Sequence, residues 1–278
     1  MSRWLPNRLR RTVLALGLDA QSLAYAWQDT KGLEHVTVHD WRADPVTTVR
    51  HILMQGSAGS RKNSVHLIAG AGLAFHWIQA PPKALASLAE LRLVANSRCS
   101  QLYGDGDWMV VGDWNAQRPF VCAAIARGTL SALCEALQAH DLAIHWYTSW
   151  GLLCSLQHRV FPSNGWSAIR TPGQILMWHC SAGLLDSLTT LPASIEEDAV
   201  RATDRALQHM RIETLRTSHL TLGTLNFLDL TAARDTAHAS ADIEPLWLGM
   251  QEQPAPCKVE SVAALSLGRM LGNQRSGS

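Results

Sequence analysis

The sequence lacks the long apolar runs and the charge excess that would assign it to several classes of protein at once. No segment approaches the roughly 20 apolar residues that a membrane-spanning helix needs. The 278 residues carry a formal net charge of +1, so no long-range field gathers nucleic acid or a strongly acidic partner. We therefore expect no transmembrane helix and no nucleic-acid partner.

Cysteine pairs are also missing. None of the six cysteines forms a CxxC motif, and most lie within apolar runs such as residues 120–125, which is typical of free thiols in a reducing compartment. Residues 1–11 resemble the basic start of a secretion signal, but the apolar run after them is short and Asp19 interrupts it. We expect a soluble, cytoplasmic protein with a flexible basic segment at residues 1–11.

The common motifs of catalysis are absent as well. The sequence contains no HExxH, no GxSxG and no GxxxxGK[ST], and Gly70-Ala71-Gly72 lacks the third glycine of a dinucleotide-binding loop. Asp105-Gly106-Asp107 offers two carboxylates, as a metal-assisted transferase would, but a turn between a helix and a strand explains the same residues. We expect no metal site.

What the chain does have is apolar patterning sufficient for two lobes. Its composition is 47% hydrophobic and its length exceeds the usual size of one domain. Residues 12–41 contain three short apolar runs separated by turn residues, which predicts a three-stranded antiparallel meander. The first run, Val13–Leu18, is typical of a central strand, and it stops at the polar turn Asp19-Ala20-Gln21-Ser22. A strand that ends on such a turn and re-enters as a second strand is also how a phosphate-binding hairpin is built.

The order of three strands, helix, strand and helix occurs from Thr12 and again from Trp166, which predicts a structural duplication. Asp44 and Pro45 are expected to begin the first helix, and a capping box over residues 194–197 is expected to open a long helix through Met210. An RNase H-type nuclease shares this order but needs converging carboxylates, and the helix at residues 45–55 has no Asp or Glu.

Eleven tryptophans are many for this length. Most are expected to fill the space between a sheet and a helix. Exposed tryptophans near the cleft expected between the two lobes would indicate a peptide partner, because this side chain is enriched at binding hot spots.

Three segments carry a resemblance to a known family. They are LALGLDAQSLAYAW at residues 14–27, the run of strands and helices at residues 108–153, and SVAALSLGRML at residues 261–271. Their order is similar to that of the actin-like ATPase fold, a duplicated RNase H-like α/β fold. Among its members the chain most resembles the PilM family of type IV pilus assembly proteins and the related cytoplasmic domain of the type II secretion protein GspL. The resemblance implies two lobes with a cleft between them: residues 12–157, with an inserted subdomain and a crossover, and residues 158–278.

The resemblance also implies a degenerate nucleotide site. In the first phosphate loop Asp19 is kept, Ala20 replaces a glycine, and the basic residue expected a few positions later is absent. We place the second loop at residues 165–168, where the family has Asp-x-Gly, and the adenine-flanking glycine pair is reduced to Gly223.

We therefore expect Asp19, Ala20, Ser22 and Gly223 to be remnants of a phosphate site. No catalytic residue and no resident cofactor are expected, with ATP left open. Asp19 is expected to form hydrogen bonds within its own turn.

By resemblance, the chain would be a cytoplasmic scaffold at the inner face of the bacterial inner membrane. Its partner would be a short cytoplasmic peptide of an inner-membrane pilus or secretion protein, and further candidates are the assembly ATPase and a second copy of the chain. Two alternatives stay open. One is an active actin-like ATPase or sugar-kinase-like phosphotransferase, in which Asp19, with Asp113 as a second candidate, holds a magnesium-bound water. The other is an interaction protein unrelated to secretion.

Overall fold

The computed structural model describes most of the chain between residues 13 and 265. The described residues are 13–28, 34–42, 44–56, 64–70, 72–83, 87–112, 114–149, 151, 163–194, 196–217, 220, 222–231, 243–245, 261, 263 and 265. They belong to two compact units, one built from residues 1–74, 125–152 and 260–278, the other from residues 75–124 and 153–259.

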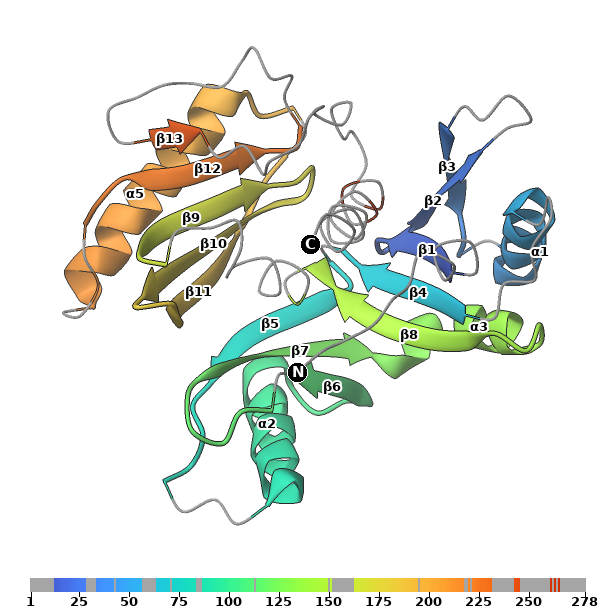
Figure 1. The fold of residues 1–278 in the computed structure, drawn as a ribbon, viewed down its shortest axis with the longest axis horizontal. Helices are drawn as coiled ribbons and strands as arrows, with labels where there is room; N and C mark the ends of the chain where they lie inside the picture. The colour runs from blue at the N-terminus through green and yellow to red at the C-terminus, as the bar shows by residue number, and fades with distance from the viewer. Residues whose placement is uncertain are drawn as a thin grey trace, which may run out of the picture. The chain divides into compact units, whose positions relative to one another are not determined.

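The first unit contains a five-stranded sheet in the order β3-β2-β1-β4-β8. The meander predicted for residues 12–41 is confirmed as β1 (Val13–Leu18), β2 (Ser22–Gln28) and β3 (Glu34–Asp40), which pair antiparallel. On the other side of β1, β4 (Ser64–Ala69) and then β8 (Ala143–Thr148) pair parallel (Figure 1). As expected of a central strand, β1 buries Leu14, Leu16 and Leu18 almost completely.

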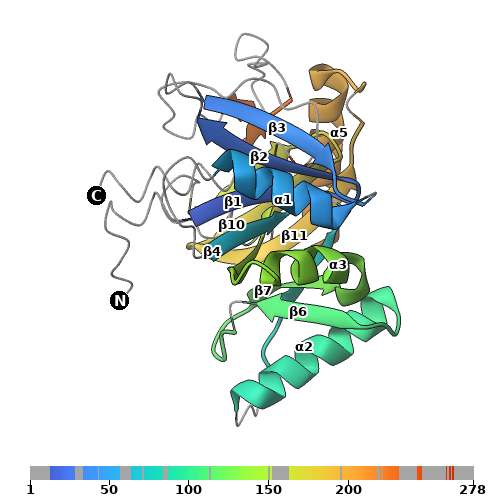
Figure 2. The same cartoon turned by 90° about the vertical axis from the view of Figure 1, so that its right-hand side faces the viewer.

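Two helices pack beside each other on this sheet, α1 (Pro45–Gly56) against β2 and α3 (Arg127–Gln138) against β8 (Figure 2). Asp44 begins α1 as predicted: its Oδ1 accepts a hydrogen bond from the Thr47 amide at 2.9 Å, and Pro45 occupies the first helical position. The buried face of α1 includes Val49 and Ile52, and that of α3 includes Leu130 and Leu133.

The second unit repeats the same sheet. Its strand order is β11-β10-β9-β12-β13, with β9 (Gly165–Arg170), β10 (Gln174–Ser181) and β11 (Leu184–Pro192) antiparallel, and β12 (Leu225–Asp229) and β13 (Ile243–Pro245) parallel. Each strand therefore has a counterpart in the first sheet, so the predicted duplication is confirmed.

Helix α5 (Ala199–Arg216) covers one face of this second sheet (Figure 1). Its buried side chains pack against Trp166, Ile175 and Met177. The predicted start of this helix is wrong. The N-cap is Asp198, whose Oδ1 accepts from the Arg201 amide at 2.8 Å, whereas Ser194 lies in a turn in which Glu197 N donates to the Ser194 carbonyl at 3.1 Å.

A smaller three-stranded sheet, in the order β5-β7-β6, is also present. It consists of β5 (Ala74–Gln79), β6 (Trp108–Gly112) and β7 (Phe120–Ala126), and α2 (Leu88–Tyr103) lies across it (Figure 1). Leu91, Ala95 and Cys99 of α2 pack on Trp77 and Phe120. Two aromatic side chains thus fill the space between sheet and helix, as expected for the tryptophans of this chain.

The division of the chain into two units differs from the lobe boundary that we predicted at residue 157. The end of the chain, placed in the second lobe by the sequence, belongs to the first unit. Ser261, Ala263 and Leu265 are helical and fully or almost fully buried, and the Ser261 amide donates to the Asp19 carboxylate at 3.2 Å. A contact between residues so far apart in the chain has no local sequence signature.

None of the described helices combines the length and the apolar character needed to cross a membrane.

Gly17 allows the helix that contains Ser261, Ala263 and Leu265, here called the closing helix, to approach β1. A Cβ at this position would lie 2.0 Å from the Ser261 carbonyl oxygen and 2.5 Å from the Leu265 amide nitrogen, so Gly17→Ala would force the helix away from the strand. We expect this variant to lower the free energy of unfolding by about 3 kcal/mol, as overpacking does in a close-packed core. Urea unfolding followed by circular dichroism measures the change.

Gly128→Ala provides the matched control, because an added Cβ in α3 would meet no atom within 4 Å. The control is expected to change stability by less than about 1 kcal/mol, in the stabilising direction. Equal stability of the two variants would show that the closing helix does not depend on Gly17.

Candidate functional site: the carboxyl ends of the parallel strands

Each large sheet has one edge where a ligand site is expected. Ligands of α/β proteins bind beyond the carboxyl ends of parallel strands, where the strand order changes direction. In the first sheet β1 and β4 end together at Leu18 and Ala69, and in the second β9 and β12 end together at Arg170 and Asp229. The two edges are related by the duplication.

At the first edge, the Asp19 carboxylate organises the turn between β1 and β2. Its Oδ1 accepts hydrogen bonds from the amides of Gln21 at 2.7 Å and Ser22 at 2.6 Å. The Asp19 amide in turn donates to the Ser22 carbonyl at 2.9 Å. These are the bonds expected of an Asp-containing turn, and they direct the turn's own amides onto a carboxylate.

The second oxygen of the same carboxylate binds the end of the chain. Asp19 Oδ2 accepts from Ser22 Oγ at 2.7 Å and from the Ser261 amide at 3.2 Å, and the two serine hydroxyls lie 2.6 Å apart. Ser261 itself is fully buried. Four donors of the chain therefore converge on one carboxylate, and sequence reasoning missed the fourth because it lies 242 residues away.

Trp41 holds the turn from the side of β3. Its indole Nε1–H donates to the Asp19 carbonyl at 3.2 Å, and its amide donates to the Gln21 carbonyl at 3.2 Å. The side chain is only 2% exposed, so it packs as a core residue. Ala20, within this turn, lies close to Gly72: a Cβ added to Gly72, whose φ is +78°, would lie 3.9 Å from the Ala20 Cβ. Gly70 and Gly72, which follow β4, thus lie next to the Asp19 turn.

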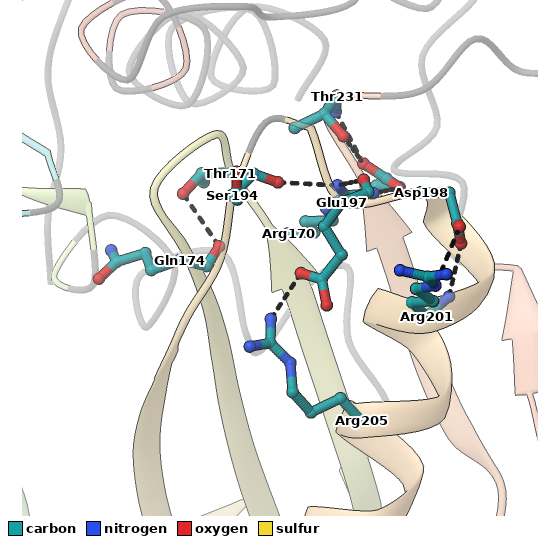
Figure 3. A network of polar contacts seen from close by, with 10 residues as sticks. Arg170, Thr171, Gln174, Ser194, Glu197, Asp198, Arg201, Arg205 and Thr231 are labelled. Atoms are coloured by element: carbon teal, nitrogen blue, oxygen red, sulfur yellow. Dashed lines mark hydrogen bonds and ion pairs between the residues drawn. The ribbon is translucent and has the colours of Figure 1, made fainter.

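The second edge is organised by a buried cation instead of a carboxylate (Figure 3). Arg170, 2% exposed, forms an ion pair from its NH1 to Asp229 Oδ2 at 3.0 Å. Its NH2 donates to the carbonyl oxygens of Ser194 and Glu197, in the segment that precedes α5. The guanidinium therefore joins the ends of β9 and β12 to the start of the helix that covers them.

Neighbouring side chains complete the network. Asp229 Oδ1 accepts from the Thr231 amide at 2.8 Å and from Thr231 Oγ1 at 2.7 Å, and Glu197 pairs with Arg205 at 2.7 Å (Figure 3). The turn between β9 and β10 is closed by Thr171, whose amide and hydroxyl both donate to the Gln174 carbonyl, at 2.8 Å and 3.1 Å. Most of the described polar groups of this edge are thus bonded to other groups of the chain, whereas Arg170 Nε and Arg205 Nε are buried and have no hydrogen-bond partner among the described residues.

Two predicted positions do not belong to this edge. Residues 165–168, proposed as the second phosphate loop, lie inside β9, and the counterpart of the Asp19 turn is Thr171–Gly173. Gly223 precedes β12, and because Leu225 is paired with Trp166, it lies at the opposite end of the sheet. Both predictions were wrong because the register of the strands decides which end of the sheet a residue reaches.

Of the other candidates, Asp113 lies outside the described residues, and Asp105 and Asp107 are exposed in the turn between α2 and β6. Within the part of the chain that the structure describes, no group of three or more His, Cys, Asp or Glu side chains is placed to hold a metal ion.

A polar cluster on β10 and β11 resembles a hydrolase triad only in composition. Asp186 Oδ2 accepts from Ser181 Oγ and lies 3.2 Å from His179 Nδ1, so serine and histidine both bond to the carboxylate and form no nucleophile–base pair. Burial, with a smaller contribution from Asp186, raises the pKa of the neighbouring Cys180 thiol to about 12. This thiol stays protonated and unreactive. Like Cys99, Cys122 and Cys134, it forms no disulfide, as expected for those four.

No model of a known protein family matches the chain, and no curated protein matches it significantly. Solved structures do match. A chain of the PilM–PilN type IV pilus biogenesis complex aligns with 77% of this chain and 81% of its own length, at 12% identity and a TM-score of 0.52. A Bacteroides thetaiotaomicron protein described as having an actin-like ATPase fold and unknown function aligns with 84% of this chain and 87% of its own, at 9% identity and a TM-score of 0.50.

The chain has the actin-like ATPase fold. The α/β fold class expected from the order of the elements is confirmed, and the two equivalent sheets are the duplicated halves of that fold. The cytoplasmic domain of EpsL, an inner-membrane component of the Vibrio cholerae type II secretion system, also aligns, with 96% of this chain and 95% of its own at 12% identity and a TM-score of 0.49. In this actin-like chain, Asp19–Ser22 and Thr171–Gly173 are the equivalent turns.

The Arg170–Asp229 pair generates a stability prediction. Arg170→Met would leave Asp229 without its cation and would free two backbone carbonyls, so we expect unfolding to become easier by about 3 kcal/mol. The double variant Arg170→Met/Asp229→Leu should recover part of this loss, because it removes the uncompensated charge. Chemical unfolding of the three proteins measures both effects.

Arg201→Met is the control, since its partner Asp198 is 3.5 Å away and the two side chains are 81% and 60% exposed. An exposed pair of this kind is worth less than about 1 kcal/mol. A similar cost for Arg170→Met and Arg201→Met would mean that the buried pair does not support the second sheet.

Proposed function

We propose that this actin-like protein is a pseudo-ATPase scaffold of a type IV pilus or type II secretion assembly platform. The observation that carries the loss of ATPase function is the set of four hydrogen bonds donated to the Asp19 carboxylate by Gln21, Ser22 and Ser261. In a working actin-like ATPase, an aspartate at this turn would have to be available to a magnesium-bound water. Here both of its oxygens are already bonded within the chain.

Phosphate recognition has further requirements that this turn does not meet. A phosphate is bound by backbone amides that point outward and by a nearby cation or metal ion. The amides of Gln21 and Ser22 point to Asp19 instead, and a carboxylate at their centre repels an anion. At the second edge the cation at the end of β9, Arg170, is buried and paired with Asp229. Both observations favour a nucleotide-free protein.

The assignment to a pilus or secretion system rests on likeness of fold. A chain from the PilM–PilN type IV pilus biogenesis complex has the same fold over most of its length. By analogy, this protein would lie in the cytoplasm at the inner face of the inner membrane and bind a short cytoplasmic segment of a membrane partner. The protein, without bound nucleotide, would then serve as a support for that segment.

Isothermal titration with ATP and magnesium tests the pseudo-ATPase. We expect no binding up to about 1 mM nucleotide, equivalent to less than about 4 kcal/mol of binding free energy. Asp19→Ala should leave this result unchanged while lowering the free energy of unfolding by about 2 kcal/mol, because the part-buried amides of Ser22 and Ser261 lose their acceptor. Asp204→Ala, on the exposed face of α5, controls for the loss of a carboxylate.

Micromolar ATP binding with slow hydrolysis, abolished by Asp19→Ala at unchanged stability, would contradict the proposal. That outcome would favour the active ATPase or sugar-kinase-like phosphotransferase.

Purification of the tagged chain from its own cells, with membranes gently solubilised, tests the scaffold. We expect an inner-membrane pilus or secretion component to copurify, and to do so equally with Asp19→Ala, because the proposed role needs no nucleotide site. Recovery of no such component would favour an interaction protein unrelated to secretion.

A further inference from the structure

Three aromatic side chains meet at the carboxyl end of α2 and form what we call the aromatic patch: Phe75 of β5, Tyr103 of α2 and Trp108 of β6. The ring centroids of Phe75 lie 4.7 Å from Tyr103 and 5.7 Å from Trp108, and those of Tyr103 and Trp108 are 6.3 Å apart. Phe75 is 41% exposed, although large aromatic side chains usually lie in the core. Leu102, which precedes Tyr103 in α2, is 42% exposed. The patch therefore presents apolar surface to solvent.

The rings are held in place by hydrogen bonds to the backbone. Tyr103 OH donates to the His76 carbonyl at 3.1 Å, and Trp108 Nε1–H donates to the Gly104 carbonyl at 3.0 Å. A Cβ at Gly106 would come within 3.0 Å of Trp108 Nε1, so the backbone of the turn packs directly against the indole. Rings fixed in this way lose little conformational entropy when a partner binds. Ordered aromatic side chains of this kind are typical binding hot spots.

The patch has an acidic rim. The turn that connects Tyr103 to Trp108 carries Asp105 and Asp107, and both side chains are exposed. Arg98 of α2 donates to Gln101 at 3.3 Å, and its charge also acts on Tyr103: burial raises the pKa of the phenol, and Arg98 lowers it by a smaller amount. The two carboxylates attract cations through their negative charge, and the aromatic rings attract them through their quadrupoles. The same charges repel anionic lipids and nucleic acids.

We propose that the aromatic patch binds a basic peptide segment with a leucine or tryptophan anchor, supplied by the membrane partner of the proposed scaffold. Cytoplasmic segments next to membrane spans carry an excess of Lys and Arg, which matches the acidic rim. The apolar anchor covers Phe75 and Leu102, and the basic side chains reach Asp105, Asp107 and the ring faces. The source of the peptide rests on the proposed function, whereas the chemistry of binding does not.

Two fluorescein-labelled synthetic peptides, KRLWRLK and its acidic match EELWELE, test the patch by fluorescence anisotropy with the full chain. We expect the basic peptide to bind about tenfold more tightly than the acidic one, and to weaken several-fold between about 50 mM and about 500 mM salt. Phe75→Ser and Asp105→Asn/Asp107→Asn should each weaken the basic peptide about fivefold or more, since they remove the anchor surface and the charge separately.

The matched control is Leu215→Ser, because Leu215 is 87% exposed on α5, outside the patch. It should bind the basic peptide as the unaltered chain does. Unfolding curves of all variants confirm that the substitutions, which fall on exposed side chains, leave the fold intact.

Equal binding of the two peptides, or equal binding by the patch variants and the unaltered chain, would overturn the proposal. So would much tighter binding by a chain that lacks residues 1–11, because the basic residues Arg3, Arg8, Arg10 and Arg11 would then be the occupant. Failure of the scaffold function would look different: the basic peptide would still bind, while no pilus or secretion component copurified.

Discussion

The carboxylate of Asp19 connects the first strand of the protein to its last described helix. A carboxylate has about four lone-pair positions, and here four donors use them. The bond to Ser261 is possible only because Gly17 lacks a Cβ and lets the helix backbone touch the strand. This one group thus shapes the β1–β2 turn, places the end of the chain in the first unit and turns the local amides away from any outside anion.

In the second half of the duplicated fold, a buried cation takes the place that the Asp19 carboxylate has in the first half. At the end of β9, Arg170 gathers acceptors: the Asp229 carboxylate and the carbonyls of Ser194 and Glu197. An isolated buried guanidinium would be costly, and these three acceptors of NH1 and NH2 offset that cost. In both halves the strand ends are joined to the structure around them by bonds within the chain. Under the proposed function, an edge that binds ligands in other α/β proteins serves here to connect structural elements.

This change fits a protein whose contacts lie on its surface. The aromatic patch of Phe75, Tyr103 and Trp108 belongs to the smaller sheet and its helix, not to either strand edge. A scaffold has to hold such a binding surface in a fixed conformation, whereas it does not need a catalytic site. The bonds that fix Tyr103 and Trp108 to backbone carbonyls provide that rigidity.

The sequence by itself determined the features that depend on neighbouring residues. The apolar run of β1, the turn at Asp19 and the start of α1 at Asp44 were all predictable, because each uses contacts within a few positions. The repeated order of elements likewise predicted the duplication. Only the tertiary structure decided that Asp198 is the N-cap of α5, since the Ser194 carbonyl is held by Arg170, 24 residues earlier. It also decided that Gly223 lies at the wrong end of its sheet and that the last helix joins the first unit. These outcomes depend on strand register and on bonds between distant residues, which no short stretch of sequence encodes.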